Sequence, residues 1–173
     1  MNERELIQRA KEKDRDAFCD LYDLYRIRLY RYAYYRLDSA EDAEDAVSDC
    51  ILSAWKQIGE LRDPDAFSGW IFRILHGCCA KAIQARIRKR ESETAVKANK
   101  ENKADPASAE ILDSLALREA LQQLSEEDRS IVLLSTVAGF TSREIGEMTG
   151  LAPGSVRSRL SRDLKKMRSF LEE

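Results

Sequence analysis

The strongest constraint on the fold is the helical spacing of the apolar residues. Over residues 43–58 they recur at alternating intervals of three and one, which places them on one stripe of an α-helix. The members of this stripe are Ala43, Ala46, Val47, Cys50, Ile51, Ala54, Trp55 and Ile58. No segment shows the sustained alternation of period two that is typical of a strand. The sequence therefore predicts an all-α protein.

Two further stripes flank this one and predict a helical unit over residues 1–90. One covers residues 18–33, and the other follows Pro64, which marks a helix start. Ser39, three residues before Asp42, is suited to cap the helix between them. Because 11 of the 13 aromatic residues lie in this region, we expect three or four helices around a core of their own.

Residues 91–109 interrupt the pattern. Val96 is the only apolar side chain there that is larger than Ala, and seven of the 19 residues are charged. Such a stretch buries too little apolar surface to offset the entropy lost on ordering. The sequence predicts a flexible linker, with a solvated helical piece as the alternative.

Apolar periodicity resumes at Ile111 and predicts a second small domain of four short helices over residues 110–173. A capping-box pattern at Thr141, a turn at Gly150 and a helix from Pro153 together indicate a helix-turn-helix. The residues expected to begin or end these helices are Ser125, Gly139, Thr141, Gly150 and Pro153.

The last helix is strongly basic on the side away from its apolar stripe. Residues 157–168 hold six Lys or Arg residues and one acid, Asp163. Such a face contacts phosphates, and Arg or Ser near the helix start reaches base edges in the major groove. A solvated face on a structural helix is the alternative, and the helix-turn-helix context favours DNA.

Two more charge blocks lie in the first unit. Residues 81–90 are basic and follow Trp70 and Phe72 on one expected helix, a combination that suits single-stranded DNA, although Trp70 alone also suits the core. Residues 38–49 contain six acids and no base. These acids exceed what complementing a helix dipole requires, which favours a basic protein partner.

The overall composition hides these blocks. The chain has 29 Lys and Arg against 31 Asp and Glu, a net charge of −2, which argues against a generic basic nucleic-acid binder. Its longest uncharged run, 130–142, has 13 residues, fewer than the roughly 20 of a membrane span. The charged first residues do not resemble a secretory signal, so we expect a cytoplasmic protein without a membrane contact.

No motif for catalysis or cofactor binding is found. A single His leaves little for acid–base chemistry, and no glycine-rich phosphate loop occurs. His76, Cys78 and Cys79 form one short cluster with no second cluster to complete a zinc site. We therefore expect no enzyme, no cofactor, no metal and no small-molecule substrate, with the cysteines on apolar faces.

Three motifs in order resemble the extracytoplasmic-function (group IV) sigma factors of bacterial RNA polymerase, within the sigma-70 family. AEDAVSDCILSAW at 43–55 and FSGWIFRIL at 67–75 resemble their second conserved region. LSEEDRSIVLL at 124–134 and FTSREIGEMTGLAPGSVRSRLSRDLKKMR at 140–168 resemble their fourth. The resemblance covers nearly the whole chain and implies region 2 over 1–90 and region 4 over 110–173.

The resemblance also implies a role for each block. The acidic helix docks on the clamp coiled coil of core RNA polymerase, the basic helix end melts the −10 element, and the last helix reads the −35 element. The loop 60–66 corresponds to the one that captures a flipped base. The implied docking residues are Asp42, Glu44, Asp45 and Asp49. The −10 residues are Trp70, Arg73, Lys81, Arg86, Arg88, Lys89 and Arg90. The −35 residues are Arg157, Ser158, Ser161 and Arg162, with Arg159 and Lys165 as phosphate contacts.

One departure from the family concerns the −10 contacts. The family usually has Asn at the position of Gly77 and Asp or Asn at the position of Lys81. Since the Asn amide reads a base edge, we expect either base capture through the loop and Lys81 or a different preferred −10 sequence.

The resemblance implies a promoter-specific initiation factor that binds core polymerase through the clamp and flap, binds promoter DNA, and has an anti-sigma factor as partner. The alternative is a stand-alone helix-turn-helix regulator with a sensing or dimerisation domain. The acidic block 38–49 and the basic block 81–90 argue against it, because a sensor domain needs neither.

Overall fold

The structure is a computed structural model that describes residues 1–92 and 115–172, and in these ranges it contains helices and no strand. The first unit has four α-helices and two short 3₁₀ helices. They are α1 (Glu3–Lys11), α2 (Arg15–Leu37), α3 (Ala40–Gln57), η1 (Ile58–Glu60), η2 (Pro64–Ala66) and α4 (Phe67–Ser92). The second unit contains α6 (Leu115–Gln122), α7 (Glu126–Thr136), α8 (Ser142–Thr149) and α9 (Pro153–Glu172).

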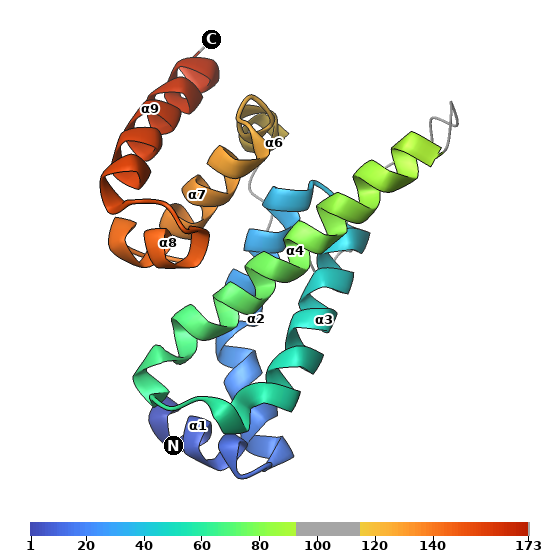
Figure 1. Ribbon diagram of the computed structural model, residues 1–173, viewed down its shortest axis with the longest axis vertical. Coiled ribbons are helices and arrows are strands. Elements are labelled where there is room, and N and C mark those ends of the chain that lie inside the picture. The colour runs from blue at the N-terminus through green and yellow to red at the C-terminus, as the bar shows by residue number, and fades with distance from the viewer. Residues whose placement is uncertain (93–114, 173) are drawn as a thin grey trace.

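The first unit forms because α2, α3 and α4 pack their apolar stripes together, with α1 across the end of α2 (Figure 1). Helix α3 begins where predicted: the Ser39 side chain accepts a hydrogen bond from the backbone N–H of Asp42 at 3.2 Å. Its stripe is buried at Ala43, Cys50 and Ala54, each fully covered. The periodicity thus identified the packed face of α3 correctly.

The second unit is set by its caps and glycines. Thr141 and Glu144 form the predicted capping box at the start of α8, and Gly150 ends that helix in the left-handed region with φ 80°. A Cβ on Gly146 would lie 2.6 Å from the carbonyl oxygen of Leu151, so only glycine fits this tight turn between α8 and α9. Both predicted helix-turn-helix elements are present.

Two details of the predicted boundaries differ from the structure. Helix α7 ends at Thr136, and Gly139, expected to end it, lies in the following turn with φ 81°. Glu91 and Ser92 of the predicted linker form the last turn of α4, and the remainder of that segment, with Ile111, lies outside the described residues.

The two units pack against each other through α2 with α7 and α4 with α8 (Figure 1). The rings of Phe72 and Phe140 meet edge to face with centroids 5.3 Å apart. Arg73 of α4 donates a hydrogen bond to the backbone oxygen of Glu147 in α8 at 2.5 Å. The first unit therefore supplies a surface on which the helix-turn-helix rests.

Candidate nucleic-acid interface

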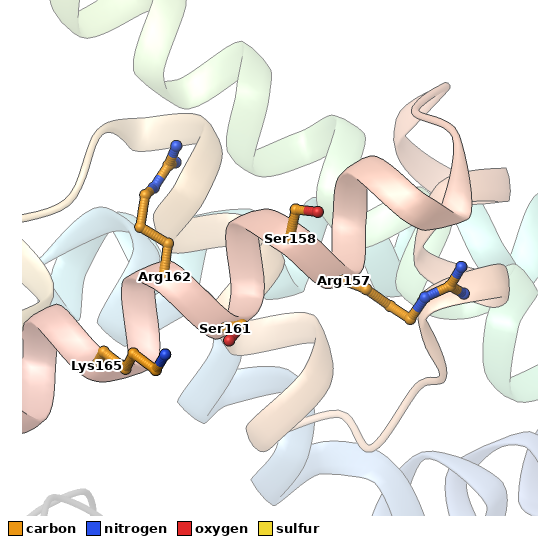
Figure 2. Close-up of a pocket in the computed structure, with 5 residues that line it drawn as sticks. All are labelled: Arg157, Ser158, Ser161, Arg162 and Lys165. Atoms are coloured by element: carbon orange, nitrogen blue, oxygen red, sulfur yellow. The ribbon is translucent and has the colours of Figure 1, made fainter.

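The predicted recognition residues lie together on α9. A shallow depression runs along this helix and is lined by the five residues labelled in Figure 2, which are Arg157, Ser158, Ser161, Arg162 and Lys165. All five are exposed. The opposite face is buried against the unit through Val156 and Met167. The helix thus offers hydroxyl and cationic donors on one open side, as contact with a DNA groove requires.

Two arginines of α9 are paired with acids at the start of α7. Arg159 Nη1 lies 2.8 Å from Glu127 Oε2, and Arg162 Nη2 lies 3.0 Å from Asp128 Oδ2. The hydrogen bond and charge of Glu127 raise the pKa of the Arg159 guanidinium, which therefore stays charged. The side chain of Arg162 remains 64% exposed, and that of Arg159 is only 34% exposed. Arg162 is therefore the more open of the two to a ligand.

The predicted docking acids divide into two groups on α3. Glu44, Asp45 and Asp49 are exposed on the outer side of the helix. Asp42 is only partly exposed, because it forms an ion pair with Arg86 of α4. The structure thus brings a predicted docking residue and a predicted −10 residue into direct contact, which the sequence did not indicate.

The predicted −10 residues extend along α4 (Figure 1). Trp70 is partly buried, with its ring 5.8 Å from that of Phe67, so the structure supports the core alternative for most of this side chain. Arg73 faces α8 as described above. The remaining cations are exposed toward the helix end, and they are Lys81, Arg88, Lys89 and Arg90.

The loop 60–66 before α4 is ordered by its own side chains. The Asp63 carboxylate accepts a hydrogen bond from the backbone N–H of Asp65 at 3.0 Å and so begins η2. Leu61 and Pro64 are buried and anchor the loop to the core. Arg62 between them remains exposed.

A buried polar cluster at the end of α2 escaped the sequence analysis. Arg36 Nη1 donates to the Tyr32 hydroxyl at 3.0 Å and to the backbone oxygen of His76 at 2.8 Å, and its Nε donates to Glu126 Oε1 at 2.7 Å. Burial and the Arg36 charge lower the pKa of His76 to about 4, so this His is neutral. The one signal in the sequence was the position of Arg36 directly after a run of aromatic residues in α2, which could have indicated a buried cation.

His76, Cys78 and Cys79 do not form a joint ligand set. Nδ1 of His76 lies 2.9 Å from the Tyr32 hydroxyl and is committed to that cluster. Cys79 is buried, and burial raises the pKa of its thiol to about 12. Within residues 1–92 and 115–172 no group of three or more His, Cys, Asp or Glu is placed to hold a metal ion. None of the described helices is both long and apolar enough to cross a membrane.

Known proteins match the chain along both units. The family model "Sigma-70 region 2" matches residues 21–91, and "Sigma-70, region 4" matches residues 114–167. RNA polymerase sigma factor CarQ of Myxococcus xanthus is 31% identical over 96% of this chain and 96% of its own length. ECF RNA polymerase sigma factor SigM of Mycobacterium tuberculosis (strain H37Rv) is 28% identical over 96% of this chain and 83% of its own length.

Two solved structures share the fold. CnrH in complex with the cytosolic domain of CnrY has a TM-score of 0.72 and 22% identity, covering 98% of this chain and 97% of that chain. The sigma factor RpoE of Bartonella quintana, in complex with the anti-sigma factor NepR, has a TM-score of 0.70 and 23% identity, covering 87% of this chain and 94% of that chain.

The family matches support promoter-specific initiation of transcription and do not favour a stand-alone regulator. Both conserved regions occur in the expected order, and the relatives match over nearly the full chain. The chain therefore belongs to the extracytoplasmic-function sigma factors of the sigma-70 family.

Proposed function

We propose that this sigma factor joins core RNA polymerase to promoter DNA through separate surfaces of its two units. Residues 1–90 dock on the polymerase and open the −10 element, residues 110–173 hold the −35 element and contact the flap, and residues 91–109 link them. Linking two weak modules raises the effective concentration of the second once the first is bound. The chain itself supplies binding surfaces and no catalytic group.

The observation that carries this proposal is the exposed polar face of α9. Arg157 and Arg162 flank Ser158 and Ser161 on the open side of the second helix of a helix-turn-helix. Arg donates to the O6 and N7 acceptors of guanine in the major groove. A Ser hydroxyl can donate to an acceptor or accept from a donor on a base edge. Lys165 and Arg159 supply charge for phosphates on the edges of this face.

Docking on the polymerase rests on the outer side of α3. Glu44, Asp45 and Asp49 project there from one rigid helix, which favours an extended basic partner surface. Asp42 is paired with Arg86, so its role is to join α3 to α4 as well as to add charge. The clamp coiled coil is the partner implied by the family.

Melting of the −10 element rests on α4 and the loop before it. Lys81 and residues 88–90 place exposed cations along the helix end, where they can track a single strand. Gly77 has no atom within 4 Å of where a Cβ would lie, so it offers open space in place of the usual Asn. We expect either base capture through the loop and Lys81 or a −10 preference that differs from the family's.

The solved structures that share the fold suggest one further partner. CnrH and RpoE are each found with a partner protein, CnrY and the anti-sigma factor NepR. We propose that this chain also has an anti-sigma factor, and that it acts in the cytoplasm, where it meets polymerase.

Run-off transcription with purified core polymerase over genomic fragments tests the function. We expect defined transcripts that require both the core enzyme and this chain. The rival function, a stand-alone helix-turn-helix regulator, predicts a tight footprint on duplex DNA without polymerase and no new transcript. That second result would overturn the proposal.

A further inference from the structure

Helix α9 carries a carboxylate, that of Asp163, on the face that packs against the apolar core. The side chain of Asp163 is only 3% exposed and occupies the inward face between Val156 and Met167. Burying an ionised carboxylate costs free energy that an apolar side chain at the same place would not cost. Packing alone therefore does not account for an acid at this position.

A second acid meets it from α7. The side chain of Asp128 is 14% exposed, and both Asp128 Oδ1 and Asp163 Oδ2 are buried without a hydrogen-bond partner among the described residues. Burial, and then the neighbouring Asp128 carboxylate, raise the pKa of Asp163. Two facing acids of this kind need a nearby cation to remain ionised together.

The cations come from the DNA-facing helix itself. Arg162 Nη2 donates to Asp128 Oδ2 at 3.0 Å, and Arg162 Nε donates to Asp163 Oδ1 at 3.4 Å. Arg159 Nη1 lies 3.6 Å from Asp128 Oδ1 in addition to its closer ion pair with Glu127. The acid pair thus holds one guanidinium through two of its nitrogens, Nε and Nη2.

This arrangement leaves the rest of the guanidinium open. A guanidinium has five N–H groups, and the two acids engage two of them in Arg162. The side chain is still 64% exposed and lines the same depression as Arg157 and Ser158. Its remaining donors are therefore available to a base edge. Because the two acids already restrict the rotamers of Arg162 in the free protein, the side chain loses less conformational entropy when it binds DNA.

We propose that Asp128 and Asp163 are positioning residues for −35 recognition, which fix the Arg162 guanidinium toward the DNA from the protein side. This inference rests on the proposed function of α9 as the −35 helix. Neither acid touches DNA, and both act through Arg162.

The test uses holoenzyme assembled from the full chain and core polymerase. Wild-type holoenzyme selects a duplex from a library randomised over the −35 region, and its affinities for that duplex and for a scrambled duplex are measured. We expect D128N and D163N each to lower the ratio of the two affinities roughly two- to tenfold. Affinity for the scrambled duplex should stay constant or rise, because one negative charge near the phosphates is lost.

Two controls separate positioning from folding and from net charge. Glu119→Gln removes one exposed negative charge from the same unit without touching either arginine, and it should leave the ratio unchanged. In an Arg162→Ala background, D128N should cause no further loss of the ratio, since its effect passes through Arg162. Thermal unfolding of each variant checks that the fold is intact.

The outcomes are distinct for each hypothesis. If the wild type selects a duplex but D128N and D163N leave the ratio of affinities for the selected and scrambled duplexes unchanged, only the positioning role is overturned. A loss that persists in the Arg162→Ala background would also overturn it and would indicate a structural role. Failure of wild-type holoenzyme to select any sequence would overturn the proposed −35 function, and the positioning role with it.

Discussion

Arg36 of α2 and Glu126 of α7 form an ion pair between the two units, with Nε and Oε1 2.7 Å apart. The Arg36 side chain is 2% exposed, whereas that of Glu126 is 41% exposed. Asp38 and Arg118 form a second ion pair beside it at 2.8 Å. Because each pair joins a residue of the first unit to a residue of the second, these contacts hold the two units against each other.

Glu126→Gln should loosen the contact between the units. The amide retains an acceptor for Arg36 but loses the charge, and because the Arg36 guanidinium is buried we expect a cost of about 1–3 kcal/mol. Small-angle X-ray scattering should show a larger radius of gyration, while circular dichroism remains that of a helical protein. Glu119→Gln provides the charge-matched control, and an unchanged scattering curve for Glu126→Gln would show that this pair does not hold the units together.

Reversing the charge of Asp45 and Asp49 to Lys should abolish binding to core polymerase. Both side chains are exposed and lie beyond the first turn of α3, so the fold should remain intact. A pull-down with core polymerase measures the loss. The same change at Asp20 and Asp23, exposed acids of α2, alters the net charge equally and should preserve binding. Retained affinity in the first variant would refute the docking role of α3.

Arg162→Ala should weaken −35 recognition by roughly 1–3 kcal/mol relative to a scrambled sequence. The reason is the loss of a base-edge donor from the open face of α9. Competition binding with holoenzyme measures both affinities. Arg168→Ala, which removes an exposed cation near the end of the same helix, should reduce both affinities alike. If Arg162→Ala lowered the affinities for the −35 sequence and the scrambled sequence equally, Arg162 would be a phosphate contact and would not read bases.

Lowering the pH should destabilise the fold through His76. Its folded-state pKa is about 4 against 6.5 unfolded, so the unfolded chain binds the proton more tightly between these values. The stability contribution is fully present above pH 6.5 and falls as the pH drops, by about 2 kcal/mol between pH 7 and pH 5. Urea unfolding at both pH values measures this change. His76→Gln should lack that part of the pH dependence. If the free energy of unfolding changed equally with pH in the wild type and in this variant, the prediction would be wrong.

Gly77→Ala should stabilise the protein by about 1 kcal/mol, because Gly77 lies inside α4 and a Cβ there meets no atom within 4 Å. Chemical denaturation measures the gain. Gly146→Ala is the opposite case, since its Cβ would lie 2.6 Å from the Leu151 oxygen, and it should destabilise the protein. A loss of stability in Gly77→Ala would mean that α4 requires glycine for another reason.

Local patterns in the sequence were enough to predict the helices and much of the second unit. The stripe on α3 is buried where the spacing of three and one placed it, and Ser39 and Thr141 cap the helices they were expected to cap. These features depend on residues within four positions of one another, so the sequence alone contains the information. The grouping of the basic side chains on the open face of α9 follows from the same helical period.

The contacts between helices were decided by the tertiary structure. Periodicity shows which side of a helix is apolar but not which helices meet, so it missed the burial of Arg36 and the pairing of Asp42 with Arg86. It also gave no reason for Asp163, which faces a second acid, Asp128, only because α7 lies beside α9. The sequence by itself determined helical elements, their caps and their charged faces, because these are local. Packing of segments distant in the chain determined which charges are open to a partner and which are already paired, because ion pairs depend on distance in space.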